Sequence, residues 1–112
     1  MPMPQFLYRL QLVRTAVLVE GPTESEAAII GAHFEYLAKG VEEGTVQLAG
    51  RTLTRDERTF GITLFVAPSE SAARDFMNND PVVKNGVMKA ELFPFRVALW
   101  SAKGPGGNEP VA

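Results

Sequence analysis

The chain has no cysteine and only one histidine, His33, among its 112 residues. The absence of cysteine excludes disulfides, thiolate metal ligands and a cysteine nucleophile together. A zinc site is not expected either, because one histidine without cysteine supplies too few of the usual ligands. The glycine-rich stretch near the C-terminus, residues 104–107, has neither a preceding strand nor a following helix, so it is not a phosphate-binding loop. We therefore expect no metal and no cofactor.

Long apolar runs and an excess of one charge are also missing. No window approaches the roughly 18 to 20 apolar residues that cross a bilayer, and the first ten residues lack the basic and apolar regions of a signal peptide. The 11 basic and 13 acidic residues are interspersed and leave a net charge of -2, so no basic face for a nucleic acid is evident. We expect a cytoplasmic protein with no membrane or nucleic-acid partner.

What the chain does have is enough apolar material for one modest core. Hydrophobic residues make up 46% of the sequence, and its length matches about one domain. We expect an N-terminal leader at residues 1–4, a folded domain at 5–100, and a flexible Gly/Pro-rich tail at 101–112.

The hydrophobic period changes repeatedly along the chain, and these changes mark the secondary structure. Alternation predicts four strands, at residues 5–13, 45–50, 59–66 and 87–100. Two helices lie between them: one with a capping box from Thr23 to Glu26 and a stop at Gly44, and one opening at Ser69 and ending before Asp80-Pro81. The order βαββαβ predicts an α+β, ferredoxin-like domain with both helices on one face of an antiparallel sheet.

The same patterns predict which side chains form the core. The first helix has an apolar stripe that places His33 at its margin. The predicted core residues are Phe6, Leu10, Phe34, Leu37 and Leu64, with Ile30, Ala38 and Val41 completing the helical stripe. The other sheet face is predicted to carry Leu7, Arg9, Gln11, Val13, Thr63 and Phe65. That second face is too apolar for free solvation, so we expect a homodimer.

Two stretches carry a resemblance to a known family. "GAHFEYLAKGVEEGTVQLAG" resembles the signature of the YCII-related (YciI-like) family, in which a helix with His leads through a Gly turn to a strand ending in Ala-Gly. "FMNNDPVVKNGVMKAELFPF" is similar to the family's second hallmark, an Asp-Pro after the second helix and a final strand ending near Pro-Phe. The resemblance spans about residues 5–97. It implies a dimeric α/β barrel with an active site around a His–Asp pair, which here would be His33 and Asp80.

Each residue of that pair also has a plain structural interpretation. His33 could simply cover the edge of the core, or it could accept and give a proton from a small cavity. Asp80 lies in "NNDP", where an Asp commonly caps a turn, but a carboxylate can also orient an imidazole and stabilise its charged form. The two residues are 47 positions apart, so only the fold can bring them together.

Two arginines are candidate substrate-binding residues. Arg51 stands where many family members have Pro, beside the expected pocket, although it also fits a solvated hairpin. Arg9 could bind an anionic ligand or form an interfacial ion pair. Two functions remain open: a cofactor-independent enzyme using His33 and Asp80 for elimination, isomerisation or related proton transfer on a small cyclic or aromatic molecule, or a non-catalytic dimeric protein that binds a small ligand in the same cavity.

Overall fold

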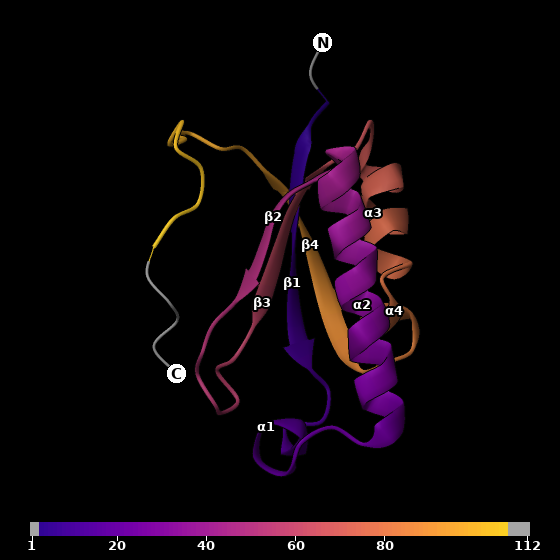
Figure 1. Cartoon of the computed structure of the whole chain (residues 1–112). Helices are drawn as coiled ribbons and strands as arrows, with labels where there is room; N and C mark the ends of the chain where they lie inside the picture. The colour runs from indigo at the N-terminus through magenta and orange to yellow at the C-terminus, as the bar shows by residue number, and fades with distance from the viewer. Residues whose placement is uncertain (1–2, 108–112) are drawn as a thin grey trace.

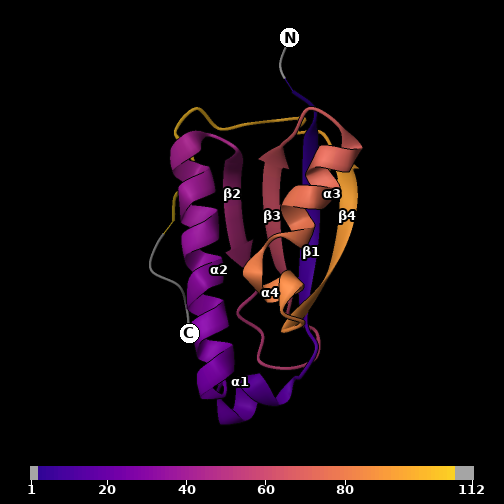
Figure 2. The same ribbon diagram turned by 90° about the vertical axis from the view of Figure 1, so that its right-hand side faces the viewer.

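The computed structural model describes residues 3–107 of the chain. It contains a four-stranded antiparallel sheet in the order β2-β3-β1-β4. The long helix α2 and the shorter α3 and α4 cover one face of this sheet (Figures 1 and 2). This is the predicted ferredoxin-like α+β fold. The elements are β1 (Gln5–Leu12), α1 (Ala16–Glu20), α2 (Glu24–Glu43), β2 (Val46–Arg51), β3 (Gly61–Val66), α3 (Glu70–Asn78), α4 (Pro81–Lys84) and β4 (Met88–Phe95).

The local signals for the two main helices are confirmed. Thr23 caps α2 by accepting a hydrogen bond from the Glu26 amide, and the Glu26 carboxylate accepts one from the Thr23 amide. The helix ends at Gly44, whose φ of 84° lies in the left-handed region that glycine adopts without strain. The Ser69 hydroxyl caps α3 by accepting a hydrogen bond from the Ala72 amide. The short helices α1 and α4 were not predicted.

The apolar stripe of α2 is rotated from the predicted one. Phe34 and Val41 are exposed, at 73% and 54%, whereas Leu37 and Gly40 are buried. Ile29, Ile30 and Tyr36 pack against the core from the same helix. The prediction was wrong for Phe34 and Val41 because it gave no apolar weight to Gly40 or to the aromatic ring of Tyr36.

The prediction for β3 was wrong by one residue. Thr63 and Phe65 point toward the helices and are fully buried. Leu64 is buried as predicted, at 5% exposed, but it lies on the other face of the sheet beside Leu7. Phe65 packs edge-on against Tyr8, with ring centroids 5.5 Å apart. Since β3 carries apolar residues on both faces, alternation alone could not fix which face is covered.

The face of the sheet away from the helices is partly apolar, as predicted. Leu7 lies between Leu64 on β3 and Phe93 on β4. Two residues further along β1, on the same face, Arg9 forms an ion pair with Glu91 on β4; the Nη2 and Oε1 atoms are 3.0 Å apart. We call this surface the open face; its other apolar members are Leu48, Ile62, Val66 and Phe95.

The last strand is shorter than predicted but does lie at an edge, as Pro94 required. Residues 96–107 contain no helix or strand. The remainder of the predicted tail, 108–112, and the first two residues of the predicted leader lie outside the described residues. Within residues 3–107, no helix has the length and apolar character needed to span a membrane.

Candidate functional site

His33 and Asp80 meet between helix α2 and the start of α4. The His33 Nδ1 atom lies 2.7 Å from Oδ1 and 2.9 Å from Oδ2 of Asp80. The His33 side chain is 17% exposed and the Asp80 side chain is fully buried. His33 is therefore deeper than the sequence suggested, because the rotation of α2 brings it inward from the margin of the apolar stripe.

Asp80 combines the two roles that the sequence left open. It is the N-cap of α4, where its Oδ1 atom accepts a hydrogen bond of 3.2 Å from the Val82 amide. Its Oδ2 atom accepts a second bond, of 2.7 Å, from the Tyr8 hydroxyl on the central strand β1. The turn chemistry of "NNDP" thus fixes the same carboxylate that contacts His33.

These donors define the charge state that the site favours. An amide and a phenol donate to the two oxygens of Asp80, an arrangement that stabilises the ionised carboxylate. The remaining contact is then satisfied when Nδ1 of His33 carries the proton and donates it to Asp80. In the neutral ring this leaves a lone pair on Nε2, and among the described residues nothing hydrogen-bonds to that nitrogen.

Tyr8 belongs to the site through its bond to Asp80. From the sequence it could supply a phenol to a pocket or pack in the core, and core packing was the expected role. Burial raises the pKa of the Tyr8 phenol far above its usual range, and the nearby charge of Asp80 adds to this effect. The nearby Thr63 hydroxyl acts in the opposite direction and lowers the pKa of the phenol. The Thr63 Oγ1 atom itself has no hydrogen-bond partner among the described residues. The signal that could have identified Tyr8 is its place on the buried face of β1, where a phenol needs a hydrogen-bond partner.

A pocket of about 810 Å³ opens beside His33, between α2 and the sheet. Most of its lining side chains are apolar, and they come from α1, α2, β1 and the β2–β3 hairpin. The exposed Phe34 and Val41 belong to this lining, which explains why apolar residues stand there without being covered. The polar side chains lining the pocket are His33, Arg51, Thr59 and Thr63.

The pocket exists because small residues stand on the sheet beneath α2. On the helix-facing side, β2 offers Ala49, and β3 offers Gly61 followed by Thr63. A larger side chain at Gly61 would also be crowded by the backbone, since an added Cβ would lie 3.3 Å from the Gly50 carbonyl oxygen. The helix-facing side of the sheet therefore leaves space for the pocket at the end where these small residues stand, whereas Phe65 fills the space at the other end.

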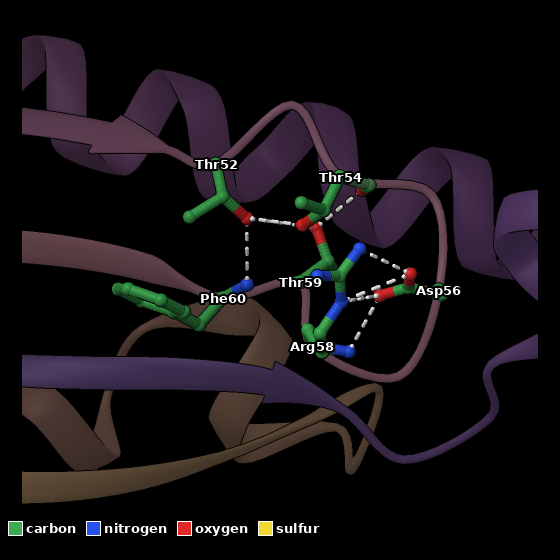
Figure 3. Close-up of polar contacts among 6 residues, drawn as sticks. All are labelled: Thr52, Thr54, Asp56, Arg58, Thr59 and Phe60. Atoms are coloured by element: carbon green, nitrogen blue, oxygen red, sulfur yellow. Dashed lines mark hydrogen bonds and ion pairs between the residues drawn. The ribbon is translucent and has the colours of Figure 1, made fainter.

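The loop between β2 and β3 holds one wall of the pocket through a set of threonine hydroxyls (Figure 3). Thr52 accepts a hydrogen bond from the Phe60 amide, and its hydroxyl lies 2.9 Å from that of Thr54 and 3.0 Å from that of Thr59. Thr59 in turn donates to the Thr54 carbonyl. These bonds fix the backbone on which Thr59 and Phe60 reach the pocket.

The two candidate arginines have different places. Arg51, at the end of β2, lines the same pocket as His33. Arg9 does not join the site, because alternation along β1 sends it to the open face while Tyr8 and Leu10 face the helices. Arg9 instead forms an ion pair with Glu91 of the same chain.

The described residues offer no cluster suited to a metal ion. Among residues 3–107, no group of three or more His, Asp or Glu side chains comes together in a geometry that could hold one. The polar groups that line the pocket are the His33 imidazole, the Arg51 guanidinium and the hydroxyls of Thr59 and Thr63.

The fold and the His33–Asp80 contact define an α+β protein of the ferredoxin-like class with a helix-covered pocket. The profile of the YCII-related domain matches residues 9–96, so the chain belongs to the YCII-related family. Comparison with curated proteins gives no match.

The solved structures to which this chain is similar include those of two enzymes. One is 5-chloro-2-hydroxyhydroquinone dehydrochlorinase (TftG) from Burkholderia phenoliruptrix AC1100 in complex with 2,5-dihydroxybenzoquinone; it is 22% identical, with a TM-score of 0.62, over 82% of this chain and 93% of that one. The other is SnoaB, a cofactor-independent oxygenase from Streptomyces nogalater, with 12% identity and a TM-score of 0.42 over 88% and 98% of the two chains. At 22% identity, the likeness to TftG concerns the fold.

Proposed function

We propose that this protein is a cofactor-independent enzyme that transfers a proton on a small cyclic or aromatic molecule bound beside His33. The observation that carries the proposal is the contact of 2.7 Å between His33 and a fully buried Asp80 at the wall of an apolar pocket. A carboxylate in this position orients the imidazole and stabilises the charge that it acquires as a base.

The proposed roles follow from the two ring nitrogens. Nδ1 donates to Asp80, so Nε2 accepts a proton from the bound molecule, and the resulting imidazolium is stabilised by the carboxylate. A molecule bound against the apolar lining would displace water from beside His33, which would strengthen this electrostatic interaction. The same nitrogen can return the proton to another atom of the substrate, which gives an isomerisation.

An elimination uses the same base. Nε2 removes a proton from a carbon or hydroxyl of the substrate, the freed electron pair forms a new double bond, and the leaving group departs with its own bonding pair. The fold neighbour TftG is named as a dehydrochlorinase, and loss of HCl from a hydroxylated ring is a reaction of this kind. We include it as the first chemistry to test for this chain.

Arg51 is proposed to bind an anionic oxygen of the substrate. It lines the pocket that His33 lines, and it is the only Lys or Arg side chain among the pocket residues. A guanidinium there would attract a phenolate or enolate and hold it while charge develops on the ring.

The working protein is proposed to be a homodimer formed through the open face. Leu7, Leu64 and Phe93 lie side by side there, and the Arg9–Glu91 pair crosses the same surface. A two-fold contact would cover this apolar area with an identical surface from a second copy. The pocket opens on the other side of the sheet, so each subunit would keep its own site.

The test is proton exchange in deuterated water. Hydroxylated single-ring compounds, beginning with 5-chloro-2-hydroxyhydroquinone, are incubated with wild type, His33→Ala and Arg51→Gln, and proton NMR follows both loss of substrate and deuterium entry. We expect exchange or turnover with wild type, none above background with His33→Ala, and weaker substrate binding with Arg51→Gln.

Binding is measured separately with 2,5-dihydroxybenzoquinone by titration calorimetry. Binding at the pocket without exchange or turnover of any compound would replace the enzyme proposal with the non-catalytic alternative. Equal activity of wild type and His33→Ala would overturn the proposed role of His33 directly.

A further inference from the structure

We propose that Tyr8 is a positioning residue of this site that acts through Asp80: its phenol donates to the carboxylate and disperses part of the negative charge that faces His33. The inference rests on the proposed function in one respect, that His33 and Asp80 act together. Tyr8 does not line the pocket, so its effect on a bound molecule would pass through Asp80.

The phenol is held rigidly enough for such a role. Tyr8 is fully buried on β1, which lies between β3 and β4 in the sheet. Its ring makes edge contacts with Phe65 and Phe76, with centroids 5.5 Å and 6.4 Å away. The hydroxyl consequently has one fixed position, 2.7 Å from Oδ2 of Asp80.

The position of the phenol completes the carboxylate's contacts. The Val82 amide fixes Oδ1, Tyr8 fixes Oδ2, and Nδ1 of His33 lies within 2.9 Å of both oxygens. Without the phenol, Oδ2 would lose its buried donor, while the Val82 amide and Nδ1 of His33 would still contact the carboxylate. Its negative charge would also be less dispersed, so the carboxylate would hold the Nδ1 proton more tightly.

Other titratable groups near this chain of contacts are few among the described residues. Tyr36 on α2 is one: burial, followed by the charge of Asp80, raises the pKa of Tyr36 to about 12. Its hydroxyl donates to the Phe76 carbonyl and not to Asp80. Arg51 of β2 is the remaining charged side chain that lines the pocket with His33.

The chain offers a matched control, because it has two tyrosines and one histidine. Both tyrosines belong to the same aromatic group around Phe76, and each donates one hydrogen bond. Tyr8→Phe removes the bond to Asp80, whereas Tyr36→Phe removes a bond to a backbone carbonyl. Since His33 is unique, its ring resonances can be followed through a pH titration without assignment against other histidines.

We expect the His33 titration midpoint to rise in Tyr8→Phe by about half a pH unit, a change of about threefold in proton affinity. The rise follows because a carboxylate with one donor fewer stabilises the imidazolium more strongly. Tyr36→Phe should leave the midpoint within experimental error of wild type. No change in Tyr8→Phe, or a fall, would overturn the positioning role.

A double-variant cycle separates this inference from the proposal on which it rests. Asp80→Asn alone should lower the midpoint, and Tyr8→Phe added to Asp80→Asn should then have no further effect. If Asp80→Asn leaves the midpoint unchanged, the His33–Asp80 pair fails and the proposed function with it. If Asp80→Asn lowers it but Tyr8→Phe acts equally with or without the carboxylate, only the inference about Tyr8 fails.

A second measurement keeps the test available if Tyr8→Phe does not fold. In the Tyr36→Phe background, growth with 3-fluorotyrosine labels Tyr8 alone and makes its phenol a stronger donor without removing it. A stronger bond to Oδ2 should lower the His33 midpoint, the direction opposite to Tyr8→Phe. An unchanged or raised midpoint would count against the proposal.

Discussion

Gly40 of α2 packs directly on Val46 at the start of β2. A Cβ atom built on Gly40 would lie 3.3 Å from Cβ and only 2.6 Å from Cγ2 of Val46, and the second distance is closer than Cβ atoms approach other atoms in folded proteins. Val46 is 2% exposed and has no room to move away. This close approach draws the C-terminal half of α2 onto the sheet and sets the rotation that turns His33 inward.

Gly40→Ala should therefore destabilise the protein although alanine favours helix. Helix propensity gains about 1 kcal/mol, but overpacking a tight contact costs about 1–3 kcal/mol, and the contact with Val46 is severe. We expect a net loss in the free energy of unfolding, measured by urea denaturation. Gly31→Ala in the same helix is the matched control: its Cβ would meet nothing within 4 Å, so it should stabilise. Similar effects at both positions would contradict the close packing.

Asp80→Asn should lower the free energy of unfolding more than a substitution at the margin of the core would. The side chain is fully buried and accepts from Tyr8, Val82 and His33. An amide can accept on only one atom, so its NH₂ group would face at least one of these donors. The expected loss in the free energy of unfolding is about 1–3 kcal/mol.

The measurement for Asp80→Asn is urea denaturation together with the proton-exchange assay. Exchange should fall because His33 loses the carboxylate that stabilises its charged form. Asp75→Asn on the exposed side of α3 is the control and should leave both stability and exchange unchanged. Wild-type stability in Asp80→Asn would mean that the buried contacts with Tyr8 and Val82 are not maintained in solution.

Whether a feature of the fold or of the site could be predicted from the sequence depends on whether it arises from residues that are close together in the chain. The capping box from Thr23 to Glu26 and the Gly44 stop depend on contacts within a few residues, and both ends of α2 were predicted. The order of strands and helices followed from the change of hydrophobic period. The ferredoxin-like fold could be predicted from these local patterns.

The parts that were mispredicted depend on contacts between distant segments. The face of β3 could not be assigned from "GITLFV", because Ile62, Leu64 and Val66 are as apolar as the residues between them. Gly40 carries no hydrophobic signal, yet its fit against Val46 sets the rotation of α2. The bond from Tyr8 to Asp80 joins residues 72 positions apart, and no local pattern indicates it.

The open face should set the oligomeric state. Phe93 lies on the edge strand β4, beside Leu7, and is 39% exposed. Phe93→Glu would place a charge in the proposed two-fold contact, next to its own symmetry mate or an apolar neighbour, and should shift the protein toward monomer. The control is Val19→Glu, at a residue of α1 that is 84% exposed and does not belong to the sheet.

Light scattering at micromolar concentration checks this prediction. Wild type and Val19→Glu should both give about twice the mass of the 12.2 kDa chain, and Phe93→Glu should approach the chain mass. A wild-type protein with the mass of one chain would exclude the homodimer.

Alkaline pH should destabilise the protein through Tyr8. The phenol ionises near pH 10 in an unfolded chain, but burial first, and then the charge of Asp80, raise its pKa in the folded protein. The unfolded state therefore loses its proton first, and the contribution of Tyr8 to stability is complete below pH 10 and declines as the pH rises above it. The slope approaches about 1.4 kcal/mol per pH unit once the unfolded phenol is fully ionised.

The comparison that isolates this effect is wild type against Tyr8→Phe in urea denaturation from pH 8 to 11.5. Lysines and Tyr36, whose pKa is also raised, titrate in both proteins, so their contributions largely cancel in the difference. The stability advantage of wild type should be constant up to about pH 9.5 and shrink above it. An advantage that stays constant to pH 11.5 would mean that the phenol ionises alike in both states, which is incompatible with a hydroxyl buried against the Asp80 carboxylate.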